Sequence, residues 1–389
     1  MQNFTFQNKT KIVFGKGVEA RTGEEVQEFS EKALFLYGQG SIKKYGIYDK
    51  VMDSLDEYDI ETVELGGVKP NPRLSLVKEG IEICETEGID FVLAVGGGSV
   101  IDTAKAIAIG VPYEGDVWDF YETDKEVEEA LPVGVVLTIP AAGSESSPGS
   151  VITKEEGGYK RDVGSEKIRP KFAIMNPEFT YTLPDYQTAA GAADIISHVM
   201  ERYFTNEPNV DFTDKLSEAT LRTIIENTPK ALEHPETYDP RSQLMWASTV
   251  AHNDLLGTGR EEDWASHQIE HELSGMYDVT HGAGLAIIFP AWMKYVYQRN
   301  LERFAQFAVR VWNVDPNFFD LEETALKGID ELEAFYRRIG LPTRLDDLEP
   351  EITDRNLKEM ARKCTEKGPV GNFVELNEED VLEIYKLAR

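Results

Sequence analysis

The chain has 389 residues, of which 41% are hydrophobic, 10% aromatic and 28% charged, as in a globular protein of two or three domains. Its 70 acidic residues against 40 basic ones give a formal net charge of −30. A surface this acidic repels nucleic-acid phosphates and anionic lipid headgroups, so we expect neither nucleic acid nor membranes as partners. The charge fits ordinary solubility or adaptation to high salt. Two cysteines, Cys84 and Cys364, exclude a disulfide framework and a cysteine-based zinc ribbon.

The N-terminal residues 1–15 alternate polar and apolar side chains, which predicts a strand or hairpin. They contain no apolar stretch long enough for the core of a signal peptide. No window of the chain approaches the roughly 18 apolar residues of a transmembrane helix. We therefore expect a cytoplasmic enzyme.

Short apolar segments alternate with segments of helical spacing in the first part of the chain. The predicted strands are 33–37, 60–65, 91–95, 133–139 and 171–175, and the predicted helices are 41–58, 72–87 and 100–109. Alternating strands and helices indicate parallel βαβ units with helices on both faces of the sheet. This pattern predicts an α/β N-terminal domain with a parallel sheet.

The sequence changes character near Leu183-Pro184, after which long amphipathic patterns predominate. The predicted helices there are 189–204, 214–232, 264–276 and 283–297. We place a boundary near residue 180, with an α/β domain at 1–180 and an all-α domain at 181–389. A cleft between two such domains is a usual place for a ligand.

A triple glycine follows the predicted strand 91–95, in the sequence Gly96-Gly97-Gly98-Ser99, and a helix begins directly after it. Glycine lets the backbone approach a ligand closely, and free amides at a helix N-terminus favour an anion such as pyrophosphate. A plain tight turn is the alternative, but three glycines exceed what a turn needs. A second loop, Thr138 to Ser147, is rich in small and hydroxyl residues suited to a ribose or a nicotinamide amide.

The loop Gly38-Gln39-Gly40-Ser41 follows the first predicted buried strand, where an adenosine ribose would lie. NAD-selective sites usually place a carboxylate on the ribose 2′-hydroxyl, and this loop has none. Ser41, Lys43 and Lys44 stand there instead and offer partners to a 2′-phosphate. We therefore expect NADP(H) to be preferred over NAD(H).

Four of the six histidines form a candidate metal site with one aspartate. Asp194 and His198 are spaced i, i+4 on one predicted helix face, and His267 and His271 repeat that spacing on a later helix. His281 precedes Gly282-Ala-Gly284 at the start of the next helix. One carboxylate and three imidazoles suit Fe²⁺ or Zn²⁺ with a position left open for substrate. The other two histidines, His234 and His252, are interpreted as ordinary structural residues.

The segment His267-Gln-Ile-Glu270-His271 also fits the His-x-x-Glu-His pattern of some zinc proteases, with Glu270 as general base. That interpretation leaves the glycine loops, Asp194 and His281 without a role. A zinc protease therefore stands only as an alternative.

Taken together, these motifs resemble the iron-containing (group III) alcohol dehydrogenase family over nearly the whole chain. The resemblance rests on Gly96-Gly-Gly-Ser-Val-Ile-Asp102-Thr-Ala-Lys105, on Asp194-x3-His198, on His267-x3-His271 and on His281-Gly-Ala-Gly284. The segments Tyr37-Gly-Gln-Gly-Ser41-Ile-Lys-Lys44 and 263–274 are similar to its butanol dehydrogenase branch, which includes NADPH-dependent aldehyde reductases.

The resemblance implies a Rossmann-like domain followed by a helical, dehydroquinate synthase-like domain, assembled as a homodimer. It implies that the metal is held by Asp194, His198, His267 and His281, and that His271 relays a proton. It implies cofactor contacts from Gly38, Gly40, Ser41, Asn71, Gly97, Gly98, Ser99, Thr138, Ser147 and Lys160, with Asp102 supporting the glycine loop. Pro148 lacks an N–H, which makes the contacts near Ser147 the least secure.

The implied reaction is hydride transfer between NADP(H) or NAD(H) and a short-chain aldehyde or primary alcohol of the butanol type. A lactaldehyde- or glycerol-type oxidoreductase of the same family is one alternative. A nucleotide-binding protein that has kept the scaffold without turnover is another.

Overall fold

The computed structural model describes residues 1–389, and the apolar runs of the N-terminal half form a six-stranded sheet. The strand order is β1-β8-β5-β4-β2-β3, and every neighbouring pair is parallel. The strands are β1 (Lys11–Phe14), β2 (Lys32–Tyr37), β3 (Glu61–Leu65), β4 (Phe91–Gly96), β5 (Val133–Leu137) and β8 (Phe172–Met175). The expected parallel sheet is confirmed, and its five predicted strands match within two residues at each end.

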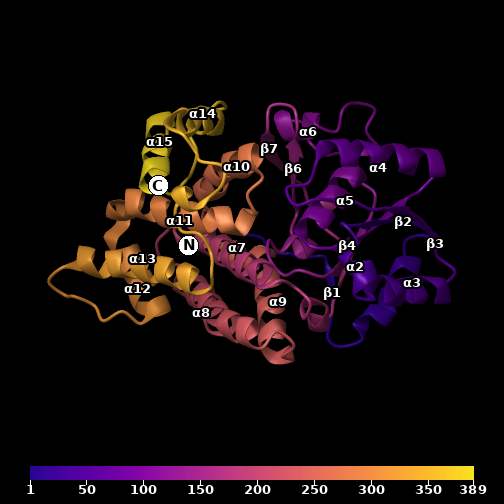
Figure 1. Ribbon diagram of the computed structural model, residues 1–389, viewed down its shortest axis with the longest axis horizontal. Helices are drawn as coiled ribbons and strands as arrows, with labels where there is room; N and C mark the ends of the chain where they lie inside the picture. The colour runs from indigo at the N-terminus through magenta and orange to yellow at the C-terminus, as the bar shows by residue number, and fades with distance from the viewer. The chain divides into compact units, whose positions relative to one another are not determined.

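Helices cover both faces of this sheet, as the βαβ pattern predicts (Figure 1). Alternate residues of β2 point to opposite faces, so Leu34 and Leu36 join one apolar cluster while Ala33 and Phe35 join the other. The helices of this part are α1 (Thr22–Gln27), α2 (Ser41–Lys44), α3 (Ile47–Glu57), α4 (Leu74–Glu87), α5 (Gly98–Gly110) and α6 (Asp119–Glu122). Helices α4 and α5 lie on the first face, and α1 and α3 lie on the second.

The structure corrects the sequence prediction at three places in this part. The single helix expected over 41–58 is broken, because Gly46 adopts a positive φ of 71° between α2 and α3. Residues 1–15, expected to form a strand or hairpin, contain only the short strand β1. An antiparallel hairpin of β6 (Gly149–Lys154) and β7 (Tyr159–Gly164) was not predicted.

The C-terminal half is almost entirely helical. Its helices are α7 (Asp185–Tyr203), α8 (Asp211–Glu233), α9 (Tyr238–His252), α10 (Ala265–Tyr277), α11 (His281–Val296), α12 (Leu301–Trp312), α13 (Leu321–Arg338), α14 (Asp354–Cys364) and α15 (Glu378–Leu387). Short 3₁₀ segments connect some of the elements: η1 (Val18–Arg21), η2 (Ser144–Ser146), η3 (Glu166–Ile168), η4 (Pro177–Thr180), η5 (Leu255–Gly257), η6 (Tyr297–Asn300) and η7 (Leu345–Asp347). None of the helices combines the length and apolar composition needed to cross a membrane.

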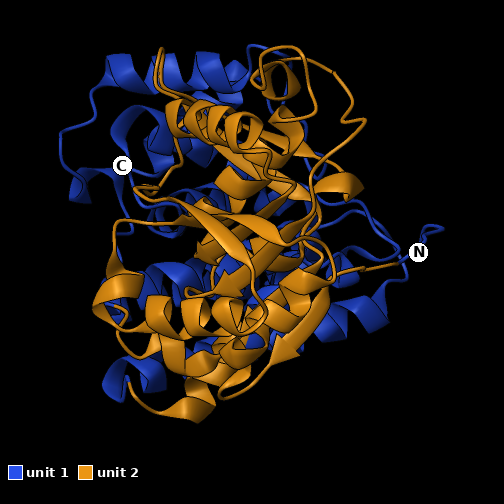
Figure 2. Ribbon diagram, turned by 90° about the vertical axis from the view of Figure 1, so that its right-hand side faces the viewer, with its two compact units in different colours: residues 1–6, 184–235, 246–389 blue, residues 7–183, 236–245 orange.

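The chain divides into two units, coloured separately in Figure 2. The sheet unit comprises residues 7–183 and 236–245, and the helical unit comprises residues 1–6, 184–235 and 246–389. The short segment 236–245 therefore belongs to the sheet unit, although the residues before and after it in the sequence belong to the helical unit.

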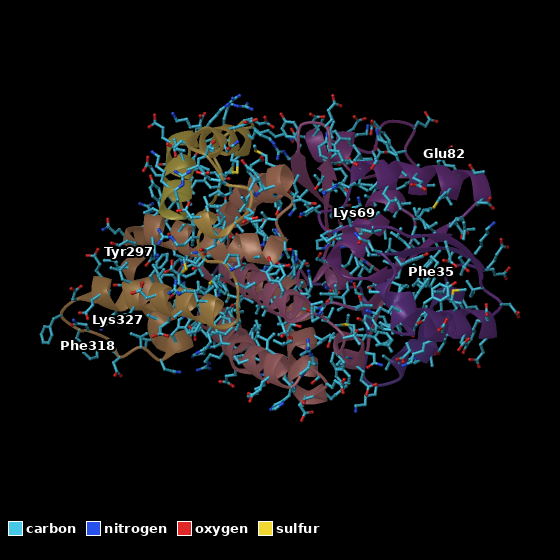
Figure 3. The ribbon with its side chains drawn as sticks, viewed as in Figure 1. Phe35, Lys69, Glu82, Tyr297, Phe318 and Lys327 are labelled. Carbon is cyan, nitrogen blue, oxygen red and sulfur yellow. The ribbon has the colours of Figure 1, made fainter.

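Apolar side chains are not all buried, as two labelled phenylalanines illustrate. Phe35 is fully buried in the sheet unit, whereas Phe318 is 88% exposed in the loop between α12 and α13 (Figure 3). Helix α7 is the opposite case, because it is buried from Thr188 to Tyr203 on every side. A helix enclosed in this way presents its few polar side chains from a fixed backbone.

Candidate functional site

Helix α7 carries two of the predicted metal ligands. The His198 Nδ1 lies 2.9 Å from the Asp194 carbonyl oxygen and 3.0 Å from the Asp194 carboxylate oxygen Oδ1. Both side chains are buried. The i, i+4 spacing therefore brings them together on one helix face, as the sequence indicates.

Two histidines from later helices reach the same place. His267 lies in the first turn of α10, and His281 is the first residue of α11. The ring centroid of His267 is 4.5 Å from that of His198 and 5.4 Å from that of His281. Asp194, His267 and His281 each offer a ligand atom, and these atoms all lie within 4.8 Å of one another. All four residues predicted to hold the metal thus converge within the helical unit.

The close approach of α11 to α7 depends on Gly282. A Cβ atom at residue 282 would lie 1.9 Å from the Ala190 carbonyl oxygen, which no side chain can tolerate. Because residue 282 is glycine, the start of α11 lies against α7 and the His281 Nε2 comes within 4.0 Å of the Asp194 Oδ1.

The donor set fits a divalent metal ion. The His267 Nε2 is buried and has no hydrogen-bond partner in the protein, which is costly unless a further group binds it. Burial, reinforced by the neighbouring histidines, holds the pKa of His267 well below its ordinary value. The imidazole therefore stays neutral, and a neutral imidazole is the form that binds a metal. Three imidazoles and a carboxylate suit Fe²⁺ or Zn²⁺.

Two buried glutamates bind the histidines on the side away from Nε2. The Glu201 Oε1 accepts from the His267 Nδ1 over 2.7 Å, and the Glu270 Oε2 contacts the His281 Nδ1. Burial, together with the Asp263 carboxylate, raises the pKa of Glu201 well above its ordinary value. Sequence reasoning missed Glu201, although it lies seven residues after Asp194 and hence on the same face of α7.

His271, the predicted proton-relay residue, is buried one turn after His267 on α10. Its ring centroid is 5.7 Å from that of His281. Glu270, His271 and His281 form a second group whose ligand atoms lie within 4.8 Å of one another. His271 thus lies beside His281, one of the four candidate ligands. It does not belong to the group formed by Asp194, His267 and His281.

A fifth histidine, which the sequence analysis interpreted as structural, also lies next to the candidate metal ligands. The ring centroid of His252, the last residue of α9, is 4.4 Å from that of His198. The Trp264 ring lies next to both, with its centroid 5.6 Å from that of His252 and 5.7 Å from that of His198. Trp264 has a positive φ of 70°. Strained backbone of this kind occurs often at functional sites. His234, by contrast, is exposed at the end of α8.

The zinc-protease interpretation does not fit this geometry. It requires Glu270 to act as a general base, but Glu270 is fully buried between Ser274 and His281. It also leaves Asp194 and His198 unused beside His267. The pattern His267-x-x-Glu270-His271 therefore belongs to the larger cluster.

In the sheet unit, the predicted phosphate loop is the turn between β4 and α5. Helix α5 begins at Gly98, and the Val100 and Ile101 amides bond back to the Gly97 carbonyl oxygen. A Cβ at Gly96 would lie 2.4 Å from the Val100 side chain, so this glycine is required by packing. The nearest neighbour of a Cβ at Gly98 is the Ala142 side chain, 3.6 Å away, so this loop and the second loop lie together.

Two side chains of helix α5 also form hydrogen bonds with the second predicted cofactor loop, residues 138–147. The Asp102 carboxylate accepts from the Ser144 hydroxyl over 2.6 Å and from the Val151 amide over 3.1 Å. The fully buried Lys105 Nζ donates to the carbonyl oxygens of Ser144 and Gly149. The sequence predicted that Asp102 supports the glycine loop, but its carboxylate contacts the second loop and β6 instead. Lys105, for which the sequence indicated no role, contacts the same two segments.

The remaining predicted cofactor residues fall into two places in the sheet unit. The Lys160 Nζ donates to the Asn71 Oδ1 over 3.0 Å, and both side chains are buried. The Thr138 amide bonds to the Gly96 carbonyl oxygen, so Thr138 adjoins the glycine loop. The Ser147 side chain is buried, and its hydroxyl oxygen lies 3.4 Å from the Lys105 Nζ.

The loop 38–41 lies at the carboxyl end of β2, which is paired with β4, so the two glycine loops share one edge of the sheet. Gly40 has a φ of 110°, which favours glycine. A carboxylate does reach this region, but from the neighbouring strand β3. The Glu64 Oε2 lies 2.8 Å from the Lys43 Nζ, and the Glu64 Oε1 accepts from the Tyr48 hydroxyl over 2.6 Å.

Comparison with known protein families gives two matches that together span most of the chain. Residues 9–177 match the model described as iron-containing alcohol dehydrogenase. Residues 188–389 match the model described as the C-terminal part of the Fe-containing alcohol dehydrogenase family.

Individual proteins and structures resemble the chain over its whole length. Probable NADH-dependent butanol dehydrogenase 1 of Bacillus subtilis is 45% identical over 386 residues, or 99% of each chain. NADPH-dependent aldehyde reductase YqhD of Escherichia coli is 38% identical over 371 residues, covering 95% of this chain and 94% of the relative. The crystal structure of NADH-dependent butanol dehydrogenase A from Thermotoga maritima superimposes with a TM-score of 0.95 at 43% identity, covering 100% of this chain and 99% of the other.

Proposed function

Because the chain belongs to the iron-containing alcohol dehydrogenase family, we propose that its reaction is hydride transfer between a nicotinamide cofactor and a short-chain aldehyde or primary alcohol. It is an oxidoreductase of the alcohol dehydrogenase and aldehyde reductase type. The butanol-type substrate is the finer part of the proposal, and the names of two relatives support it.

In this proposal Asp194, His198, His267 and His281 hold one divalent metal ion, Fe²⁺ or Zn²⁺. The observation that carries it is that the ligand atoms of Asp194, His267 and His281 lie within 4.8 Å of one another, with the His267 Nε2 buried and unpartnered. The His198 ring lies next to that of His267. Such an ion supplies Lewis-acid chemistry, which stabilises negative charge on the substrate oxygen during hydride transfer. The residues themselves fix the position of that charge, because α7 carries two of them on a fully buried backbone.

We assign residues 1–180 to dinucleotide binding and residues 181–389 to metal and substrate binding. The nicotinamide cofactor supplies the hydride, and the protein aligns it. The proposed contacts are Gly38, Gly40, Ser41, Asn71, Gly97, Gly98, Ser99, Thr138, Ser147 and Lys160, with Asp102 holding the second loop from below. The free amides at the start of α5 favour the pyrophosphate.

His271 is proposed to carry a proton between the reacting oxygen and solvent. It is 7% exposed and lies beside His281, so it is close to the metal ligands and not fully enclosed. An imidazole titrates in the range in which such a transfer is useful.

The choice between NADP(H) and NAD(H) is a separate part of the cofactor assignment. The relatives from Bacillus subtilis and Thermotoga maritima carry NADH in their names, and the one from Escherichia coli carries NADPH. The preference for NADP(H) expected from the sequence therefore stays a prediction. We infer that the pair formed by Lys43 and Glu64 decides it, because Glu64 neutralises a lysine that would otherwise face a 2′-phosphate.

The variant Glu64→Gln tests this inference. It should raise the ratio of kcat/KM for NADPH to kcat/KM for NADH by about threefold to tenfold, because a charge-assisted contact to the 2′-phosphate becomes available. Glu61→Gln is the matched control, since Glu61 pairs with Lys32 at the other end of the same strand. An unchanged ratio in Glu64→Gln would remove this pair from cofactor selection.

The reaction itself is tested by reduction of butyraldehyde with NADPH and, separately, NADH. The protein is first stripped by a chelator and then reloaded with Fe²⁺ or Zn²⁺. Metal-dependent oxidation of the reduced cofactor is the expected result. Bound cofactor without turnover of any short aldehyde would favour the non-catalytic alternative. Faster turnover of lactaldehyde or glycerol than of butanol-type substrates would favour the second alternative.

A homodimer and a cytoplasmic location stay predictions from the sequence. Strand β1 supports the first, because it lies at the edge of the sheet and Phe14 at its end is partly exposed. Phe4 and Phe6 are exposed as well, although they lie outside β1. An unpaired sheet edge is a surface on which a second chain can add. Light scattering coupled to size-exclusion chromatography would determine the oligomeric state.

A further inference from the structure

We propose that Glu201 and Glu270 are positioning residues for the metal, each fixing one histidine in the orientation and tautomer that metal binding requires. The inference rests on the proposed function, since it concerns the same four ligands. It goes beyond that function by assigning the strength of metal binding to two buried carboxylates that are not ligands themselves.

Glu201 is fully buried and fixes both the backbone and the side chain of His267. Its Oε1 accepts from the His267 amide over 3.1 Å and from the His267 Nδ1 over 2.7 Å. Its Oε2 accepts from the Trp264 amide over 2.8 Å. One carboxylate on α7 thus takes three donors from the start of α10 and joins the two helices that carry the ligands.

Glu270 fixes His281 in a similar way. It is fully buried on α10, and its two oxygens contact the His281 Nδ1 and the Ser274 hydroxyl. A Cβ atom at Gly284 would lie 2.4 Å from the Glu270 Oε1. Glycine at this position of α11 therefore leaves room for the Glu270 carboxylate. The carboxylate therefore joins α10 to the first residue of α11.

The partners determine which ring nitrogen carries the proton. The atoms that face each Nδ1 are carboxylate or backbone carbonyl oxygens, which act as acceptors in these hydrogen bonds, so Nδ1 is the nitrogen that carries the proton. This holds for His267 and His281 through the glutamates, and for His198 through the Asp194 carbonyl oxygen. In all three rings the Nε2 is then the unprotonated nitrogen, which is the form that binds a metal. Partners of this kind typically change metal affinity by about 10–100-fold.

The two glutamates differ in how well glutamine can replace them. At residue 201 both oxygens face N–H donors, so one of them would meet the glutamine NH₂ group, which is itself a donor. At residue 270 the second oxygen faces the Ser274 hydroxyl, whose single hydrogen can point to the Val279 carbonyl oxygen instead. That hydroxyl can accept from a glutamine NH₂, so only the charge is lost. Glu201→Gln should therefore weaken metal binding more than Glu270→Gln.

The experiment measures metal affinity directly, without substrate or cofactor. Full-length protein is stripped by a chelator, and the Kd for Zn²⁺ is obtained by competition with a chromophoric chelator. The visible absorption of bound Co²⁺ reports the ligand geometry. Glu272→Gln is the matched control, because Glu272 is an equally buried carboxylate on α10 that faces Lys363 instead of a histidine.

We expect Kd to rise about 10–100-fold in Glu201→Gln, by a smaller factor in Glu270→Gln, and not in Glu272→Gln. The Co²⁺ spectrum should change in the first variant only. If Glu201→Gln does not fold, Ser274→Ala is the substitute, because it removes one hydrogen bond of Glu270 and should raise Kd less than tenfold.

Equal Kd values for all the glutamate variants would overturn the inference. The proposed function fails in a different way, namely when the wild-type protein binds Zn²⁺ or Fe²⁺ tightly but reduces no aldehyde. The two failures are therefore distinguishable.

Discussion

The Lys105 Nζ lies 2.7 Å from the Ser144 carbonyl oxygen, so a fully buried ammonium group of α5 holds the loop that follows β5. The same nitrogen reaches the Gly149 carbonyl oxygen at 2.7 Å and the Ser147 carbonyl oxygen at 3.0 Å. Its position explains why a lysine follows the glycine loop and Asp102 in the sequence. The lysine joins the two loops that are proposed to bind the cofactor.

Replacing Lys105 by methionine should lower the free energy of unfolding by about 3–5 kcal/mol, because it leaves three carbonyl oxygens without their buried donor and removes the positive charge near the buried Asp102. Urea unfolding followed by circular dichroism would measure the change. Lys78→Met is the control, since Lys78 pairs with Asp116 at the surface and should contribute about 1 kcal/mol or less. Equal losses in both variants would contradict the role assigned to Lys105.

Burial also lowers the pKa of Lys105 from its ordinary value to about 8. Between pH 8 and 10.5 the unfolded chain therefore binds more protons at this residue than the folded chain does, and stability rises with pH. We expect the unfolding free energy of the wild type to increase relative to that of Lys105→Met across this range, by about 3 kcal/mol at most. Urea titrations at several pH values would measure the difference. A constant difference would show that the lysine titrates normally.

Cys84 should be inert to thiol reagents while the protein is folded. It is buried in α4, and burial raises its pKa to about 12, so almost no thiolate is present at pH 8. Iodoacetamide should therefore modify Cys364, which is half-buried, but not Cys84, until urea unfolds the chain. Mass spectrometry of tryptic peptides would identify the site. Rapid modification of Cys84 in the folded protein would contradict the packing of α4 against the sheet.

His267 and His271 lie one turn apart on α10 and should behave differently when replaced by alanine. His267→Ala should lose bound metal and turnover together, because His267 supplies the buried Nε2 of the cluster. His271→Ala should retain the metal but turn over more slowly, with an altered dependence of kcat on pH. Metal analysis by mass spectrometry and kcat against pH would separate the two. An unchanged pH profile would remove His271 from proton transfer.

Much of the sheet unit was predictable because its strands are continuous apolar runs. Residues 33–36 and 91–95 are buried on both faces, so composition alone identified these strands. The hairpin of β6 and β7 was missed because β7, Tyr-Lys-Arg-Asp-Val-Gly, is mostly polar and short. The break at Gly46 was missed because glycine inside a helical pattern does not by itself end a helix.

The candidate metal ligands were predictable for a different reason. Asp194 and His198 share a helix face, so their spacing alone indicated their proximity. Glu201 lies on the same face and could have been included, since seven residues complete two turns. His252 and Glu64 reach their partners only through the packing of separate elements. Spacing along the chain carries no information about such contacts.

The absence of a side chain at Gly282 has a consequence for how mutational scans of this family are interpreted. Residue 282 has no side chain that could carry a proton or bind a metal, yet any larger residue there must push α11 away from Ala190. His281 would then move away from Asp194, although the His281 side chain itself is unchanged. A scan would score position 282 as intolerant and rank it with the histidines. The cause there is the close packing of the α7 and α11 backbones, which only glycine permits at residue 282.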